Sequence, residues 1–355
     1  MSQKMKNAIF VCLFVAATAA IVLWSFQNRT RYRPASAVNF VMNTIVEQRV
    51  FGKGAEKTVE ETSAGLAEFE KLVSAYFPNS EIVKINEAAG EHPVEVSEQT
   101  MQLLKLAKEY SQQSNGTFDV TIAPLTMEWN ITGSNPHIPD EESIQSLLGL
   151  VDCNSLVLDE EAGTAMLEKK GQAIDLGGIA KGYSCDIFRQ AAERNGVTSG
   201  YASIGGNIVV IGKAPDGSDY RFGIRDPRGD QSEFIGTLAL EGKTMATSGD
   251  YERYFEEDGV RYHHILNPRT GYPSDSGLIS VSVICEDGAL ADYLSTAIFV
   301  QGKEEAFKVM EGQEFQLVLV DKDKKVWISP ELKDNFQINP EKQGAYSFEF
   351  YGEEQ

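Results

Sequence analysis

The sequence predicts an α+β fold in which helices pack on mixed, largely antiparallel sheets. Short strands with alternating apolar residues follow one another between residues 200 and 285, and the helical patterns lie in separate groups before and after them. Strands and helices therefore do not alternate strictly, which favours this class over a parallel α/β sheet. A chain of 355 residues is long enough to bury a full core.

The chain begins with an uncharged apolar segment. The run from Ala8 to Phe26 carries no charge and is long enough to cross about 30 Å of hydrocarbon as a helix. Ala17-Thr18-Ala19 has the form of a signal-peptide cleavage site, so a cleaved signal peptide is the alternative. Because the apolar run continues beyond that site, the sequence favours one uncleaved N-terminal membrane helix.

The remaining elements are expected in a mixed order. Residues 37–51 alternate like a strand, and helices are expected at about 59–76 and 98–112. The later elements are a hairpin near 155–169, five short strands between 200 and 285, helices near 288–311, and strands at 315–321 and 325–329. The predicted organisation is a membrane segment and tether (1–35), one domain (36–340) and an acidic C-terminal tail (341–355).

The charge of the chain limits its partners. The whole chain has 32 basic and 52 acidic residues, and residues 1–35 hold five of the basic and none of the acidic ones. Subtracting those five leaves 27 basic against 52 acidic side chains, a net charge of −25 for the rest. Nucleic acid is excluded as a partner, because its binding rests on Lys and Arg. If this body binds a polyanion such as a nucleotide, it needs a divalent cation as a bridge.

The four cysteines indicate neither a zinc site nor a disulfide framework. They are scattered, no C-x-x-C pair occurs, and Cys12 lies in the apolar segment. A disulfide among Cys153, Cys185 and Cys285 stays open.

The common nucleotide signatures are absent. "GTLALEGKT" (residues 236–244) resembles a P-loop, but it has five residues between its glycines and alternates like a strand. "SIGGN" (residues 203–207) lacks the third glycine of a dinucleotide fold. It is a strand followed by a turn, where backbone N–H groups could approach a phosphate.

The segment "IDLGGIAKGY" (residues 174–183) carries two readings. Asp175 ends an apolar strand, Gly177 and Gly178 permit close backbone approach, and a helix starts near Ala180. A glycine turn before a helix N-terminus is a natural site for an anion, and Lys181 in the first turn suits one. Tight packing of helix on sheet is the equal alternative.

The segment "GTFDVTIAPLTMEW" (residues 116–129) places Phe118 and Asp119 directly after a turn. An exposed aromatic ring beside a carboxylate suits a heterocycle that stacks and donates hydrogen bonds. A capped strand start explains the same residues equally well.

The segment "ALADYLSTAIF" (residues 289–299) places Asp292 and Thr296 four residues apart on one helical face. A carboxylate and a hydroxyl in this arrangement are oxygen ligands for a hard cation such as Mg²⁺. Taken alone, the simpler interpretation is structural: an acidic residue near the start of a helix, and a threonine whose hydroxyl bonds to an earlier backbone carbonyl of the same helix.

The segment "YHHILNPRTGYP" (residues 262–273) holds two of the four histidines. Pro268 and Gly271 suit a turn. Taken by itself, this segment therefore predicts half-exposed histidines with a structural role.

Seven segments in one order resemble the ApbE family of FAD:protein FMN transferases. Besides "IDLGGIAKGY", "SIGGN", "GTFDVTIAPL", "ADYLSTA" and "YHHILNPRTGYP", they include "YFPNSEIVKIN" and "TSGDYERYF". The resemblance runs from about Val38 to about Ser329, and it implies an ApbE-like, T-fold-related domain. It also implies Mg²⁺-dependent transfer of FMN from FAD to a Thr or Ser hydroxyl of a target protein, with release of AMP.

The resemblance further implies the site residues and the location. The metal ligands would be the carbonyl of Gly178 with Asp292 and Thr296, helped by Ser295. FAD would lie along Met42, Tyr76, Thr117, Phe118, Asp119, Asp175, Lys181 and Leu266. The acceptor would be a subunit of a membrane redox complex, and the catalytic domain would lie on the extracytoplasmic (periplasmic) side of the cytoplasmic membrane, held by the N-terminal helix.

Histidine chemistry then gives the paired histidines a role. A hydroxyl that attacks a pyrophosphate phosphorus is helped by a base of near-neutral pKa. The resemblance assigns this role to His264, with His263 structural, and predicts a rate that rises with pH through the imidazole range. Two other functions stay open: an FAD pyrophosphatase that uses water, and a membrane-tethered flavin-binding protein without turnover.

Overall fold

The computed structural model describes residue 18 and residues 33–310 and 314–352. The predicted membrane helix at Ala8–Phe26 lies, apart from Thr18, outside the described residues. No helix among the described residues is both long and apolar enough to cross a bilayer.

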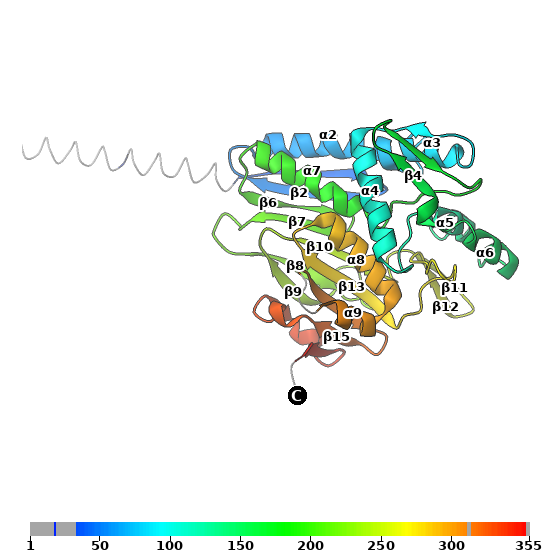
Figure 1. Cartoon of the computed structure of the whole chain (residues 1–355). Coiled ribbons are helices and arrows are strands. Elements are labelled where there is room, and N and C mark those ends of the chain that lie inside the picture. The colour runs from blue at the N-terminus through cyan, green and yellow to red at the C-terminus, as the bar shows by residue number, and fades with distance from the viewer. Residues whose placement is uncertain (1–17, 19–32, 311–313, 353–355) are drawn as a thin grey trace, which may run out of the picture.

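One large sheet organises the domain (Figure 1). It has nine strands in the order β1-β2-β6-β7-β10-β13-β14-β15-β17, and all neighbours are antiparallel except β15 and β17. The α+β class with antiparallel-rich sheets is thus confirmed. The strands are β1 (Pro34–Val41), β2 (Thr44–Phe51), β6 (Ser199–Ile204), β7 (Asn207–Gly212), β10 (Thr244–Gly249), β13 (Leu278–Cys285), β14 (Gln316–Asp321), β15 (Lys325–Ile328) and β17 (Ser347–Phe350).

Three smaller sheets surround the large one. Strands β8 (Tyr220–Arg225), β9 (Phe234–Leu240) and β16 (Phe336–Ile338) form one, and β3 (Val94–Glu95), β4 (Leu156–Asp159) and β5 (Thr164–Leu167) form another. The third is the hairpin of β11 (Tyr254–Glu257) and β12 (Val260–His263). The β16-β9-β8 sheet packs its Ile224, Ile235 and Leu238 against the large sheet.

Helices cover the opposite face of the large sheet (Figure 1). Helix α2 (Ala55–Val73) packs on β1 and β2, α7 (Ala180–Arg194) on β6 and β7, and α8 (Gly288–Gln301) on β10 and β13. Their apolar faces meet alternate strand residues in buried clusters, so burial sets their orientation. The other helices are α3 (Glu81–Glu87), α4 (Glu98–Gln113), α5 (Ala123–Trp129), α6 (Glu141–Leu148) and α9 (Lys303–Met310).

Two segments differ from the expectations. The strand expected at residues 37–51 is a hairpin, whose two-residue turn at Met42 and Asn43 has φ angles of 56° and 54°. The C-terminal segment is not a simple acidic tail, because β17 pairs in parallel with β15 at the edge of the large sheet. Phe348 packs into the core there, which offsets the acidic composition around it.

The three cysteines in the described part of the chain, Cys153, Cys185 and Cys285, are free and buried. Burial raises the pKa of each thiol. They are therefore protonated, apolar members of the core rather than a disulfide framework.

Candidate active site

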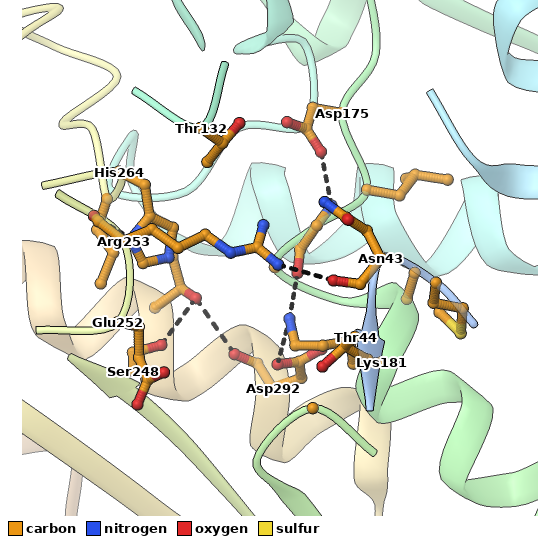
Figure 2. A pocket seen from close by; sticks show the side chains of 18 of the residues that line it. Asn43, Thr44, Thr132, Asp175, Lys181, Ser248, Glu252, Arg253, His264 and Asp292 are labelled. Carbon is orange, nitrogen blue, oxygen red and sulfur yellow. Dashed lines mark hydrogen bonds and ion pairs between the residues drawn. The ribbon is translucent and has the colours of Figure 1, made fainter. Parts of the chain in front are cut away.

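A cavity of about 650 Å³ lies at the turn end of the β1–β2 hairpin (Figure 2). The C-terminal end of α2, the loops before α5 and α7, strand β10, helix α8 and the loop after β12 meet around it. Every site residue predicted from the sequence except Ser295 lines this cavity: Met42, Tyr76, Thr117, Phe118, Asp119, Asp175, Gly178, Lys181, His264, Leu266, Asp292 and Thr296.

Asp292 reaches the cavity because α7 and α8 touch through glycines. A Cβ added to Gly182 would lie 2.1 Å from the carbonyl oxygen of Gly288 and 2.5 Å from the Cβ of Asp292. Only glycine permits this approach, and it lets the amide of Gly182 donate to Oδ2 of Asp292 at 2.8 Å. The carboxylate is 4% exposed. This acid is therefore held rigidly at the N-terminal turn of α7, with its other oxygen nearer Lys181.

The oxygen atoms around Asp292 form a candidate cation site. Thr296 lies one helical turn after Asp292, and its hydroxyl is 3.2 Å from Oγ of Ser248. A Cβ on Gly178 would lie 3.4 Å from Oγ1 of Thr296, so the backbone of Gly178 adjoins this hydroxyl. Among the described residues no three His, Cys, Asp or Glu side chains gather as a metal cluster. A cation here would therefore rely on one carboxylate, hydroxyl and carbonyl oxygens, and the ligand itself.

Ser295 lies outside the cavity, unlike the other predicted ligands. It is fully buried, and its hydroxyl donates to the carbonyl of Asp292 at 2.8 Å. The same hydroxyl is 2.8 Å from Oγ of Ser248, which does line the cavity. Ser295 thus supports the position of Ser248.

Lys181 projects from the first turn of α7 toward the cavity (Figure 2). Its Nζ donates to the carbonyl of Gly177 at 2.7 Å and lies 3.8 Å from Oδ1 of Asp292. The N-cap residue of α7, Ile179, supplies no side-chain cap. The first-turn amides of Ala180 and Gly182 are nevertheless bonded, to the carbonyl of Leu176 at 2.8 Å and to Asp292. The loop before α7 keeps its shape because the amide of Gly177 donates to Oδ1 of Asp175 at 2.8 Å.

The loop after β12 holds His264 against the cavity. The amide of Gly271, with φ of 76°, donates to the carbonyl of Asn267 at 2.8 Å, which closes the turn. Nε1 of Trp129 donates to the carbonyl of Gly271 at 2.7 Å and fixes the turn to α5. These two hydrogen bonds fix the loop that begins at His264.

His264 has one defined tautomer. Its Nδ1 lies 3.3 Å from the carbonyl oxygen of Arg253, which only accepts, so Nδ1 carries the proton and Nε2 keeps a lone pair. Desolvation in the cavity, followed by the charge of Arg253, lowers the pKa of His264 to about 3. The free protein therefore holds this ring neutral and able to accept a proton at Nε2. The lowered pKa differs from the near-neutral value expected from the sequence, because a half-buried imidazole beside a guanidinium resists a second positive charge.

His263 points into the core instead. It is 6% exposed, its Nε2 donates to the carbonyl of Ser274 at 3.0 Å, and its Nδ1 accepts from the amide of Ile265. Its ring meets Phe299 edge-on at 5.4 Å. His263 ends β12 with its ring in the core, and His264 begins the following loop at the cavity, so the two rings do not share one role.

The aromatic residues are arranged differently from the expectation. Phe118 was expected to be exposed, yet it is 6% exposed and packs edge-on against Tyr293. It lies in the loop between α4 and α5 and packs in the core cluster with Tyr110 of α4 and Tyr293 of α8, so it offers no free ring face. Tyr76, which is 64% exposed at the cavity wall, is the ring that a planar ligand could reach.

Three further predicted residues, Asp119, Thr117 and Met42, are fixed at the cavity by hydrogen bonds. Both oxygens of Asp119 accept backbone amides, from Thr121 at 2.8 Å and Cys153 at 3.0 Å, but the capped strand start is wrong, because the chain turns into α5 at Ala123. Thr117 is buried and donates to the carbonyl of Ser114 at 2.9 Å. The amide of Met42 donates to Glu70 at 2.8 Å.

Arg253 is a cavity residue that the sequence reasoning did not single out. Its Nη2 crosses to the carbonyl of Asn43 at 3.2 Å, at the tip of the β1–β2 hairpin (Figure 2). Its own carbonyl orients His264. The segment "TSGDYERYF" contained this arginine and Ser248, but no local spacing showed that either side chain reaches the cavity.

Comparisons with known proteins agree with the resemblance. The sequence model of the ApbE family matches residues 42–319. A Klebsiella pneumoniae (strain 342) protein named FAD:protein FMN transferase is 36% identical over 262 residues, covering 74% of this chain and 81% of the relative. A Treponema pallidum (strain Nichols) protein of the same name is 30% identical over 329 residues, covering 88% and 91%.

Solved structures share the fold. The ApbE protein from Thermotoga maritima matches with a TM-score of 0.80 at 34% identity, over 85% of this chain and 99% of that one. The flavin transferase ApbE from Vibrio cholerae matches with a TM-score of 0.76 at 26% identity, over 85% and 99%.

Proposed function

The chain belongs to the ApbE family, and on that premise we propose the reaction of its cavity: Mg²⁺-dependent transfer of FMN from FAD to a Thr or Ser hydroxyl of an acceptor protein, with release of AMP. Relatives named FAD:protein FMN transferase over most of this chain make it an enzyme of that type. We further propose that the ion is Mg²⁺, that the acceptor group is a Thr or Ser hydroxyl, and that AMP is the leaving group.

The single observation that carries the proposal is the neutral ring of His264 in the cavity. The acceptor oxygen forms a bond to the phosphorus of the FMN half of FAD, and the P–O bond to the AMP half breaks. The hydroxyl proton passes to Nε2 of His264, since Nδ1 is held by the carbonyl of Arg253. Once FAD is bound, its phosphates stabilise the imidazolium, so the pKa of His264 rises from its value in the free enzyme.

The donor set around Asp292 fits Mg²⁺. The ion prefers oxygen ligands and commonly binds through one or two carboxylates together with substrate phosphates. Asp292, Thr296 and the carbonyl of Gly178 would hold it. Bound there, Mg²⁺ supplies neutralisation of phosphate charge.

Two basic side chains support pyrophosphate binding in a chain that is otherwise strongly acidic. Lys181 and Arg253 both line the cavity, and Nη2 of Arg253 donates to the backbone carbonyl of Asn43. A guanidinium satisfied by a carbonyl can exchange that bond for a stronger one to a phosphate oxygen. FAD would place its pyrophosphate between these two cations and Asp292.

In-gel flavin fluorescence tests the proposal. Purified chain is incubated with FAD, Mg²⁺ and detergent-solubilised membrane proteins from source cells that lack this gene. The proposal expects a fluorescent protein band that needs the wild-type chain, FAD and Mg²⁺. FMN and AMP without a labelled band would identify the pyrophosphatase, and bound FAD without AMP would identify the flavin-binding protein.

We also propose that residues 8–26 anchor the chain in the cytoplasmic membrane, with the catalytic domain on its outer side. The apolar length of this segment supports the anchor. A membrane redox-complex subunit would then be within reach as acceptor.

A further inference from the structure

Three exposed apolar side chains form a patch on the β1–β2 hairpin. Val38, Phe40 and Ile45 are 70%, 75% and 58% exposed, and we call them the hairpin patch. Phe40 and Ile45 are directly opposite each other in the ladder. Val38 precedes Phe40 by two residues, so its side chain lies on the same face of the sheet. The inward positions of the same strands, such as Val41 and Val46, are buried under α2. The patch is therefore apolar surface that this fold does not use for its own core.

The patch adjoins an open sheet edge. Strand β1 is the first strand of the large sheet, and no other strand in the described residues pairs with its outer side. Val41 and Thr44 close a two-residue turn as a bonded pair, and such pairs alternate along an antiparallel ladder. Val38 and Phe40 therefore direct their N–H and C=O groups away from β2. Proteins usually blunt such edges, since they accept further strands.

The edge leads directly to the cavity. Ile45 of the patch lines the cavity, as do Met42, Asn43 and Thr44 of the turn. Glu47, the cross-strand partner of Val38, also lines it. A chain laid along β1 would therefore arrive at the cavity where Arg253 meets Asn43. On the proposed function, a second protein must bring a hydroxyl to this place.

We infer that the acceptor protein docks here as an extended segment that adds to the outer edge of β1 and packs apolar side chains on the hairpin patch. The inference rests on the proposed transfer to a protein hydroxyl. A polypeptide satisfies both the free backbone groups and the apolar patch, as in other strand additions, whereas a lipid surface offers only apolar contact. Because a strand rises about 3.3 Å per residue, the packed side chains lie within roughly three to five residues of the modified Thr or Ser.

Steady-state transfer to graded amounts of solubilised membrane protein, from source cells lacking this gene, tests the surface. The variants are Phe40→Ser and Val38→Ser/Phe40→Ser, with Phe40→Leu as the conservative rescue. Phe234→Ser is the matched control, since Phe234 is 39% exposed on β9 and does not line the cavity. We expect the half-saturating acceptor concentration to rise about tenfold in Phe40→Ser and further in the double variant. The rate at saturation and the affinity for FAD stay within about twofold of wild type, and the melting temperature stays within a few degrees. Phe40→Leu restores the half-saturating acceptor concentration of the wild type.

Three results overturn the inference. An unchanged half-saturating concentration, or an equal rise in Phe234→Ser, shows that the patch does not contact the acceptor. Weaker FAD binding in Phe40→Ser shows that the patch shapes the cavity instead. Loss of binding to anionic lipid vesicles with unchanged transfer shows that a membrane surface covers the patch. If the wild-type chain labels no protein, the proposed function itself fails, which is a different outcome from normal labelling by the variants.

Discussion

Replacing Gly182 by alanine tests whether the contact between α7 and α8 builds the site. The new Cβ would lie 2.1 Å from the carbonyl oxygen of Gly288 and 2.5 Å from the Cβ of Asp292. Neither atom can rotate away, and ordinary contacts begin near 3.5 Å, so the helices must part by roughly 1 Å. Overpacking of this kind costs up to about 3 kcal/mol. The better helix propensity of alanine returns about 1 kcal/mol, which leaves a net loss of about 2 kcal/mol.

Separation of the helices also lengthens the bond from the amide of Gly182 to Asp292. We therefore expect a melting temperature lower by several degrees and a Mg²⁺ concentration for half-maximal transfer that rises about tenfold, or roughly 1.4 kcal/mol. Thermal melting and Mg²⁺ titration of the transfer rate measure both. Gly344→Ala is the matched control, because a Cβ there meets nothing within 4 Å. A Gly182→Ala protein with wild-type melting and wild-type Mg²⁺ dependence would refute the reasoning.

Four further predictions follow from the site and the sequence. Asp292→Ala should abolish transfer at millimolar Mg²⁺ while FAD binding survives in weakened form; the protein should stay folded but less stable, since the bond from the Gly182 amide to this buried carboxylate is worth about 1.5–3 kcal/mol. Wild-type rates by in-gel fluorescence would remove Asp292 from the metal site. His264→Asn should lose about 10²–10⁴-fold in single-turnover rate at saturating FAD, whereas His263→Asn, whose ring is in the core, should act through stability; equal rate losses at unchanged stability would contradict this assignment. Because the pKa of His264 is lowered to about 3 in the free enzyme, its base form is already complete above about pH 5, so kcat/KM should be flat from there to pH 8 while the acid limb of kcat lies at higher pH; a kcat/KM that rises through pH 6.5 would show an ordinary imidazole. Protease added to intact spheroplasts should digest the catalytic domain, and full protection would place it on the inner side.

The class of fold could be predicted because its signals are local. Of the site residues, local patterns indicated only candidates such as Asp292 and Thr296, and the family resemblance supplied the full set. The alternation of β6 and the four-residue spacing of Asp292 and Thr296 are properties of one segment each. The turn chemistry of Asn267 to Gly271 is local as well. Patterns of this kind survive folding unchanged, since they follow from the geometry of a strand, a helix or a turn.

The remainder depended on contacts between distant segments. Gly182 meets Gly288, and Arg253 reaches Asn43, across separations that no spacing encodes. The expected exposure of Phe118 failed because Tyr293, far along the chain, packs against it. The strand β17 looked like an acidic tail, because a four-residue edge strand has too few positions to show alternation. The lowered pKa of His264 likewise depends mainly on burial and on the charge of Arg253, which the tertiary structure brings against the ring.

The mass of an acceptor protein after reaction tests the central claim most directly. The labelled band from the transfer assay is purified, and its intact mass and peptide fragments are measured beside the AMP released into solution. The account predicts an added FMN moiety, with loss of one water, on a Thr or Ser, and one AMP for each modified acceptor, both absent with His264→Asn on the same timescale. AMP together with free FMN and an unmodified acceptor mass would contradict it.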